Sequence, residues 1–333
     1  MRVIQATAAG GPEVLSVVEA PEPVAGPGQL LVEVAAAGVN FIDTYRRSGL
    51  YPMAFPHVVG SEGAGVVLAV GPSAGDATGP ATAVGDRVAW LAGTAGSYAE
   101  RVLVDATQAV PVPQTVDLDV AAAVLLQGAT AHYLVDATFP VLPGQDVLVH
   151  AGAGGVGLLL TQLAVARGAR VLTTVSSPHK EELSRAAGAT DVLRYDLLGD
   201  LARELPQWVR ARTGGAGVHT VFDGVGRATF DASLASLRPR GGLALFGGSS
   251  GPVPPVDPQR LAAGGSLFLT RPTLGHYVVT RAELLGRTDA LLGAIAAGTL
   301  AVRIGSRYRL DQAADAHRAL EGRATTGKVL LLP

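Results

Sequence analysis

Three glycines, Gly152, Gly154 and Gly157, have the spacing G-x-G-x-x-G. Residues 146–150 before them form a short apolar run that is typical of a buried parallel strand. Residues 158–167 after them are apolar enough for a buried helix, and a second strand-like run follows. In this order, free backbone N–H groups and the helix dipole would meet at the start of the helix. The pattern therefore predicts a site for the diphosphate of a dinucleotide.

Each glycine has a predicted task. Gly152 allows the tight turn, Gly154 lets the diphosphate approach the backbone, and Gly157 lets the helix pack closely on the strand. The alternative is an ordinary turn, because the chain contains 43 glycines and such spacings also arise by chance. The flanking strand and helix favour dinucleotide binding.

The end of the second strand indicates which dinucleotide would bind. A site for NAD usually has an acidic residue there, and this chain has none at the tip. Ser177 is predicted to cap the next helix, with Pro178 as its first residue. Lys180 then lies in the first turn, where the helix dipole disfavours a cation, but where the 2′-phosphate of NADPH would bind it. The alternative is a solvated lysine beside Glu181 and Glu182, and we favour NADPH.

A third candidate region is residues 38–51, which contain the amide of Asn40 and the phenols of Tyr45 and Tyr51. These groups could donate hydrogen bonds to a developing oxyanion. From the residues alone, a surface loop with a short helix and ordinary tyrosines is the favoured interpretation.

Composition limits the remaining possibilities. A length of 333 residues predicts two domains. The complete absence of cysteine excludes disulfides, thiol nucleophiles and cysteine-ligated zinc. A net charge of −2 without a basic patch argues against nucleic acid as a partner. No apolar run approaches 18 uninterrupted residues, so we expect no membrane span and a cytoplasmic protein.

The elements that would position these residues divide the chain into parts. Residues 1 to about 120 read as short strands between Gly/Pro turns, and a helix begins near residue 120. From 146 to about 272 strands and helices alternate, which predicts a parallel sheet covered on both faces. Its strands are predicted at 146–150, 170–175, 191–195, 219–223, 242–247 and 267–271. A helix after Asp200 is less certain, since Pro206 should break or kink it. The last strand, 328–332, is expected to fold back onto the first part.

Several motifs together resemble one family. They are Asn40 to Tyr45, His57 to Gly65, Gly154 to Gly157 with Gln162, Phe222 to Gly226, Gly241 to Gly251, Thr270 to Pro272, and Gly322 to Lys328. The chain resembles the zinc-independent NADPH:quinone oxidoreductases, the zeta-crystallin-like branch of the medium-chain dehydrogenase/reductase superfamily, over nearly its whole length. The resemblance implies an α/β protein with a GroES-like, mostly β catalytic domain (1–124 and 273–333) and a doubly wound Rossmann domain (125–272) that binds NADPH in a cleft.

The resemblance also implies roles for single residues. Asn40, Tyr45 and Tyr51 would line the nicotinamide and substrate side as catalytic residues, with Asn40 also contacting the cofactor. The other implied cofactor contacts are Gln127, Thr130, Gly152, Gly154, Gly155, Val156, Gly157, Ser176, Lys180, Tyr195, Phe246, Gly247, Ser249, Arg271 and Arg323.

The chain departs from related patterns at two places, one of which bears on metal binding and the other on the glycine turn. Zinc-dependent cousins carry a histidine beside the acid that corresponds to Glu62, and this chain has Ser61 there. Glu62 is therefore expected to be a structural or supporting acid, and His57 a packed loop histidine. Where the family usually has a small Ser or Ala, the glycine run has Gly152. We expect no metal site.

The expected function is reduction of a quinone by NADPH, without metal. An alternative is an NADPH-dependent reductase of α,β-unsaturated ketones, aldehydes or enoyl thioesters, and another is a non-catalytic NADPH-binding protein. A homodimer paired through the sheet edge near 242–271 is also expected, because an uncovered edge invites association.

Overall fold

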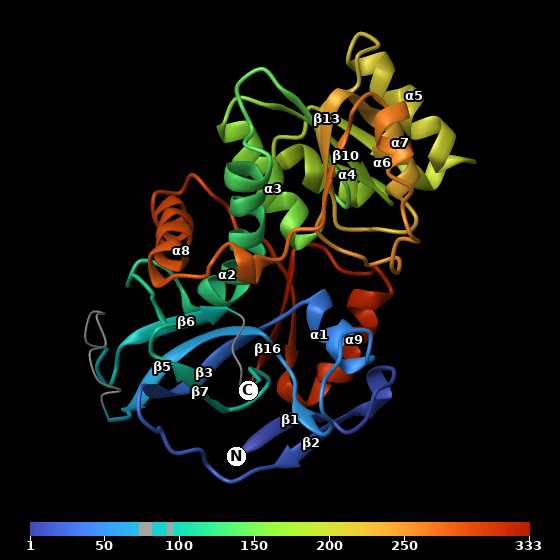
Figure 1. The fold of residues 1–333 in the computed structure, drawn as a ribbon. Helices are drawn as coiled ribbons and strands as arrows, with labels where there is room; N and C mark the ends of the chain where they lie inside the picture. Colours follow the sequence, from blue (N-terminus) through green and yellow to red (C-terminus); the bar gives the residue numbers. More distant parts are fainter. Residues whose placement is uncertain (73–81, 92–95) are drawn as a thin grey trace. The chain divides into compact units, whose positions relative to one another are not determined.

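The computed structural model describes residues 1–72, 82–91 and 96–333. The chain divides into two compact units (Figure 1). One, the two-segment unit, combines Met1–Ala129 with Val278–Pro333, and the other, the central unit, is Thr130–Tyr277. Helix α2 (Leu118–Tyr133) runs across the first boundary. The boundaries read from the sequence, 124/125 and 272/273, both lie a few residues earlier.

The central unit contains a six-stranded parallel sheet. Its spatial order is β11-β10-β9-β12-β13-β14. The strands are β9 (Asp146–Val149), β10 (Arg170–Val175), β11 (Asp191–Arg194), β12 (Val218–Asp223), β13 (Leu237–Leu245) and β14 (Phe268–Thr270). This is the order of a dinucleotide-binding Rossmann sheet, whose switch point lies between the first and fourth strands, here β9 and β12. The predicted fold class is confirmed for this part.

Helices cover the sheet of the central unit. They are α3 (Gly155–Ala166), α4 (Pro178–Ala186), α5 (Leu201–Arg212), α6 (Phe230–Ser236) and α7 (Gln259–Ala263). Helices α3 and α4 contact β10, whereas α6 contacts β12 and β13 and packs against α5. Helix α5 continues through Pro206, contrary to the expected break. Its buried face, Leu205, Pro206 and Val209, offsets the hydrogen bond that proline cannot make.

The two-segment unit is mainly β. A seven-stranded sheet has the order β15-β16-β3-β5-β6-β8, with β7 also paired to β3, and a three-stranded sheet has the order β2-β1-β4. Within the residues that are described, its strands are β1 (Arg2–Ala6), β2 (Leu15–Glu19), β3 (Gln29–Val39), β4 (His57–Val58), β5 (Glu62–Val70), β6 (Arg87–Leu91), β7 (Arg101–Asp105), β8 (Val110–Pro111), β15 (Ile304–Arg309) and β16 (Lys328–Leu332).

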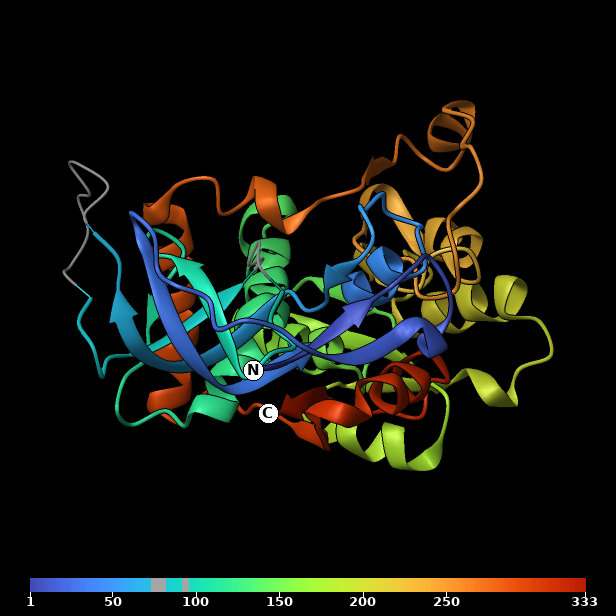
Figure 2. The ribbon, with the colours of Figure 1, turned by 90° about the horizontal axis from the view of Figure 1, so that it is seen from below.

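Both ends of the chain build this unit. Strand β16 pairs with β3, placing Leu330 opposite Gly38. The two termini lie near each other in both ribbon views (Figures 1 and 2). Among the described residues, three further α-helices belong to this unit: α1 (Phe41–Arg47), α8 (Arg281–Ala296) and α9 (Ala313–Glu321).

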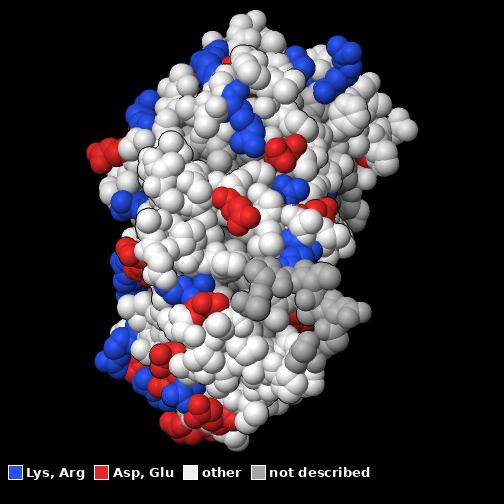
Figure 3. Space-filling view, turned by 90° about the vertical axis from the view of Figure 1, so that its left-hand side faces the viewer, with Lys and Arg blue, Asp and Glu red and all other residues white. Residues whose placement is uncertain are grey.

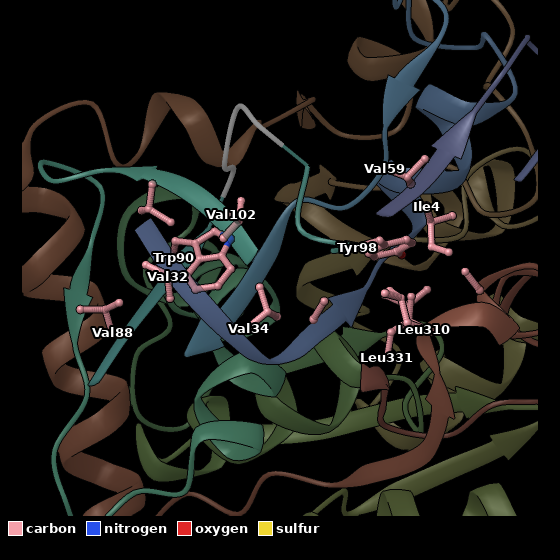
Figure 4. Close-up of a cluster of buried hydrophobic side chains, with 14 of the residues drawn as sticks. Ile4, Val32, Val34, Val59, Val88, Trp90, Tyr98, Val102, Leu310 and Leu331 are labelled. Atoms are coloured by element: carbon pink, nitrogen blue, oxygen red, sulfur yellow. The ribbon is translucent and has the colours of Figure 1, made fainter. Parts of the chain in front are cut away.

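The core of the two-segment unit holds two large aromatic side chains (Figure 4). Trp90 is fully buried near Val32, and its indole N–H donates to Ser97 Oγ at 2.9 Å. Tyr98 is fully buried near Ile4 and Val59. Burial of each large apolar side chain contributes about 1.5–3 kcal/mol, so this core fixes the strands that carry the candidate site.

One helical stretch, Leu118–Thr138, is long and apolar enough to cross a membrane by length and composition. About two-thirds of its apolar window, 67%, is buried within the protein. Such burial is typical of a core helix. On the face drawn in Figure 3, acidic and basic side chains are interspersed.

Candidate functional site

The glycine turn joins β9 to α3 in the central unit. Its left-handed residue is Ala151, with φ of 53°, and Gly152 follows it directly in the turn. Gly152 is required for packing, because a Cβ there would lie 2.7 Å from Thr173 Cβ and from Ser184 Oγ. Gly154 is the N-cap of α3. A Cβ on Gly157 would collide with the carbonyl of Ala151, which agrees with its predicted packing role.

Open space remains at the start of α3. A Cβ on Gly154 would approach only atoms of Ala151, the nearest at 3.2 Å. The backbone at the helix start, which includes Gly155 and Val156, can therefore be approached closely by a ligand. Free N–H groups at such a helix start favour an anion.

A buried polar cluster, which was not predicted from the sequence, supports this turn. His150 bonds Thr174 Oγ1 at 2.9 Å and Ser233 Oγ at 3.0 Å. Ser233 in turn donates to Asp223 Oδ2 at 2.7 Å. Burial lowers the pKa of His150, which keeps the ring neutral. The cluster joins the ends of β9, β10 and β12, and its members are too far apart in sequence to form a recognisable pattern.

The loop after β13 lies beside the loop after β12. Gly247 approaches Gly224 so closely that a Cβ on Gly247 would collide with the Gly224 carbonyl. The Ser249 N–H donates to the same carbonyl at 3.3 Å, and the Phe246 ring covers Gly224. These three predicted cofactor contacts, Phe246, Gly247 and Ser249, thus share one loop at the strand ends.

The end of β10 has the predicted capping arrangement. Ser177 is the N-cap of α4, and its hydroxyl accepts from the Lys180 N–H at 3.3 Å, with Pro178 as the first helical residue. The capping prediction is confirmed. Lys180 Nζ donates to Ser176 Oγ at 3.2 Å. Ser176 directly follows β10 and Tyr195 directly follows β11, its parallel neighbour, whereas Lys180 lies in the first turn of α4.

Asn40 is buried in the two-segment unit, where it is the N-cap of α1. Its amide nitrogen donates to Glu62 Oε1 at 2.7 Å and to the Gly38 carbonyl at 3.4 Å. Its amide oxygen accepts from Lys328 Nζ at 2.8 Å and from Gln127 Nε2 at 3.3 Å. All four hydrogen-bonding positions of the amide are therefore used within the protein.

Glu62 and Lys328 form an ion pair with side chains 0% and 1% exposed. Glu62 Oε2 also accepts from the backbone N–H of Leu126 in α2, at 2.8 Å. Gly38 leaves room for the carboxylate, since a Cβ there would lie 2.5 Å from Glu62 Oε1. Glu62 was expected to be structural. Lys328 was missed, although a lysine opening an otherwise apolar strand was an available signal.

Gln127 has one amide atom without a partner. Its Nε2 faces Asn40, and its Oε1 is buried without a hydrogen-bond partner among the residues that the structure describes. Leaving such a buried acceptor without a donor costs about 1–3 kcal/mol, so this position is suited to a bound group that donates a hydrogen bond, from a ligand or from an ordered water.

A second buried network joins α1 to α9. Asp43 accepts from Asn40 N–H at 2.9 Å, Ser61 Oγ at 2.5 Å and Tyr98 Oη at 3.2 Å. Burial raises the pKa of Asp43 to about 6. His317 lies between Tyr98 Oη and Arg47 Nη1, each at 3.1 Å. Burial, with the nearby Arg47 charge, lowers the pKa of His317 to about 3. Because arginine only donates, His317 Nε2 carries the hydrogen that faces Tyr98.

These shifts predict how the protein responds to acid. The folded-state pKa of His317 is below the ordinary 6.5, so its contribution to stability is present above pH 6.5 and is lost as pH falls toward 3. The raised pKa of Asp43 acts in the opposite direction between about pH 6 and 3.8. In His317→Gln only the histidine contribution disappears, because Asp43 is common to both proteins.

The wild type should therefore lose its stability advantage over His317→Gln by on the order of 2–3 kcal/mol between pH 7 and pH 4. Denaturant unfolding at both pH values measures this difference. A constant advantage across the range would contradict the assignment.

The two candidate tyrosines lie together. The Tyr45 and Tyr51 rings meet edge to face, with centroids 5.4 Å apart. Phe41 lies 6.1 Å from Tyr45. Tyr51 is 38% exposed, next to the exposed Leu50. This surface offers aromatic faces and phenol groups to a flat, electron-poor ring.

The remaining predicted contacts are more scattered. Thr130 lies three residues after Gln127 on α2. Arg271 follows β14 in the central unit, and Arg323 follows α9 in the two-segment unit with φ of 56°. Their roles stay predictions. Among residues 1–72, 82–91 and 96–333, no group of three or more His, Cys, Asp or Glu side chains is placed to hold a metal ion.

A Rossmann unit and a β unit made from both chain ends together define the medium-chain dehydrogenase/reductase architecture. Residues 26–114 match the alcohol dehydrogenase GroES-like domain, and residues 155–283 match the zinc-binding dehydrogenase model. The quinone oxidoreductase of Pseudomonas aeruginosa is 42% identical over 331 residues, with 99% of each chain covered. A 2-haloacrylate reductase from a Burkholderia species is 40% identical, with 92% of each covered. A mycobacterial structure complexed with NADPH is 52% identical, with a TM-score of 0.96 and 100% of both chains covered.

The chain belongs to the quinone oxidoreductase family of this superfamily. The family inferred from the sequence motifs, and the α/β fold with its GroES-like part, are thereby confirmed.

Proposed function

We propose that the protein is an NADPH-dependent quinone reductase that needs no metal. The observation that carries this proposal is the end of β10, where Lys180 Nζ meets Ser176 Oγ at 3.2 Å on a strand tip without an acid. A hydroxyl and an ammonium suit a 2′-phosphate, which NADH lacks. The names of the quinone oxidoreductase and of the NADPH-bound relative support it.

The described residues fit such a cofactor at further points. The N-terminus of α3 would hold the diphosphate, where Gly154 permits close approach. The orphaned Gln127 Oε1 would accept from an N–H group of the cofactor. When bound, NADPH would supply the hydride. Tyr45 and Tyr51 would orient the acceptor ring and donate to its developing oxyanion, and water would supply the completing proton.

Asn40 has a different part in this proposal from the one first predicted. Its amide is saturated by protein groups, so donating to a substrate would break an existing hydrogen bond. We place it instead behind Gln127, which it contacts through its oxygen.

NADPH oxidation measured against a panel of quinones, enones and enals tests the proposal. We expect the highest kcat/KM with quinones, and unchanged turnover after dialysis against a strong chelator. Loss of turnover that zinc restores would exclude the metal-free mechanism.

The 2-haloacrylate reductase relative favours a second candidate, reduction of an activated carbon–carbon double bond. Higher kcat/KM with enones or enals than with quinones would select it. NADPH binding without turnover of any acceptor would instead indicate a non-catalytic NADPH-binding protein.

Tyr51→Phe tests oxyanion support, because it removes one hydroxyl and keeps the ring against Tyr45. We expect kcat/KM with a good quinone to fall roughly tenfold or more, as for the loss of a hydrogen bond to a charged group. An unchanged value would remove Tyr51 from the mechanism, and Tyr45→Phe would be the next variant.

We further propose a cytoplasmic homodimer. Strand β14 is an edge strand of the central sheet, and its Phe268 is 59% exposed. Pairing of two protomers through this edge would cover the unpaired backbone groups of β14 and the exposed Phe268 side chain. Light scattering that gives a monomer at micromolar concentration would contradict the dimer.

We also propose that the two-segment unit is the catalytic domain and that the central unit is the NADPH-binding domain.

A further inference from the structure

We propose that Glu62 and Lys328 are positioning residues, which fix the polarity of two amides so that Gln127 presents an acceptor to the carboxamide N–H of the nicotinamide. This inference rests on the proposed NADPH function. It assigns a task to a buried ion pair that the hydride-transfer mechanism does not otherwise use.

The first step is the orientation of Asn40. An amide can turn about its last bond and exchange its oxygen for its nitrogen. Glu62 Oε1 can only accept, so it requires the Asn40 nitrogen, whereas Lys328 Nζ can only donate and requires the Asn40 oxygen. Both members of the ion pair therefore specify the same orientation, and they do so where neither side chain is more than 1% exposed.

The second step is the orientation of Gln127. The Asn40 oxygen faces Gln127 at 3.3 Å, so Gln127 must turn its nitrogen toward Asn40. Its oxygen is then left buried, with no hydrogen-bond partner in the described part of the chain. The opposite orientation would bring two amide oxygens together. The ion pair thus fixes the orientation of the Asn40 amide, and the Asn40 amide fixes the orientation of the Gln127 amide.

The third step is the class of ligand group. A quinone carries carbonyl acceptors and no N–H or O–H donor, so it gains nothing from the Gln127 oxygen. The nicotinamide carboxamide carries two N–H donors. An acceptor of fixed polarity would hold this carboxamide in one rotation and thereby orient the ring.

The backbone of α2 makes the inference testable. Leu126 N–H holds Glu62 Oε2 and requires an oxygen at that position. In Glu62→Gln the new nitrogen must therefore face Asn40. If Lys328→Met is added, Asn40 can turn its oxygen toward the new amide nitrogen at position 62. The Asn40 nitrogen then faces Gln127, so Gln127 turns its oxygen toward Asn40 and its nitrogen away from it. The double variant should present a donor where the wild type presents an acceptor.

The experiment compares the dissociation constants of NADPH and its 3-acetylpyridine analogue, whose methyl ketone has no N–H. Fluorescence titration without a quinone gives both constants. In the wild type we expect the analogue to bind about tenfold more weakly, as for one lost buried hydrogen bond. In the double variant Glu62→Gln/Lys328→Met the ratio should fall to about one, because both ligands can offer a carbonyl.

Arg47→Met is the matched control. It breaks another ion pair of the same unit, the one between the buried Arg47 and the partly exposed Glu321, without a contact to Gln127. We expect a lower Tm and an unchanged ratio of the two dissociation constants. If the double variant does not fold, Asn40→Leu keeps the ion pair, interrupts its link to Gln127, and should also bring the ratio close to one.

A wild-type ratio of one would overturn the inference. So would a wild-type ratio that Glu62→Gln/Lys328→Met and Asn40→Leu both preserve. Neither result would contradict the binding of NADPH itself. Failure of the wild type to bind NADPH at all would instead refute the proposed function. The two failures are thus distinguishable by the wild-type titration with NADPH alone.

Discussion

Replacing Lys328 with methionine should lower the free energy of unfolding of the two-segment unit by roughly 3–5 kcal/mol, the usual cost of removing one partner from a buried ion pair. The Glu62 carboxylate would stay fully buried, held by Asn40 and by the Leu126 N–H, without its counter-charge. Methionine has a similar volume, so cavity formation adds little. Chemical denaturation followed by a probe in this unit, such as Trp90 fluorescence, measures the loss.

The double variant Glu62→Gln/Lys328→Met separates charge from packing. It removes both charges and keeps both volumes, so it should recover most of the stability that Lys328→Met loses. Equal stability of the single and double variants would show that the lost charge pairing is not the cause.

Lys180→Ala should weaken NADPH binding about ten- to a hundredfold, as for the loss of a charge-assisted hydrogen bond of on the order of 1.5–3 kcal/mol. NADH affinity should barely change, because NADH has no phosphate to meet the ammonium. The preference for NADPH should also shrink with added salt, since the lysine is half-buried and its ion contact is partly screened. Titration of both proteins with both cofactors gives the four constants.

Arg185→Ala provides a control on the same helix. Arg185 lies in the last turn of α4, is 50% exposed and pairs with Glu181, so it changes the net charge equally but far from the helix start. NADPH affinity should change little in this variant. Parallel losses for NADH and NADPH in Lys180→Ala, or equal wild-type affinity for both cofactors, would refute the assignment of Lys180.

The central unit was largely predictable because its signals are local. Apolar runs between Gly/Pro turns gave the six strands to within a few residues, and Ser177 with Pro178 gave the start of α4. The exceptions depend on tertiary packing. Pro206 is tolerated within α5 because its face is buried, and the left-handed residue of the glycine turn is Ala151, which no sequence pattern indicated.

The buried polar networks could not be predicted from the sequence. Asn40, Glu62, Gln127 and Lys328 meet only because β16 pairs with β3 and α2 passes above Glu62. No spacing of residues in the sequence predicts such a contact. His317 and Asp43, joined through Tyr98, were missed for the same reason. The polar residues that were recognised lay near a glycine motif or matched a family motif.

Because β16 is the last strand of the chain, synthesis imposes an order on folding. Every residue of the central unit has left the peptidyl-transferase centre once Tyr277 has been added, while Lys328 is still to be translated. At about 5–20 residues per second, the 51 residues from Val278 to Lys328 (328 − 277) take roughly 3–10 s. Throughout that interval Glu62 has no counter-charge and β3 lacks one neighbour. Until β16 has been synthesised, the nascent chain therefore carries an open edge at β3 beside a carboxylate that lacks its counter-charge, and only the addition of β16 permits both to be paired.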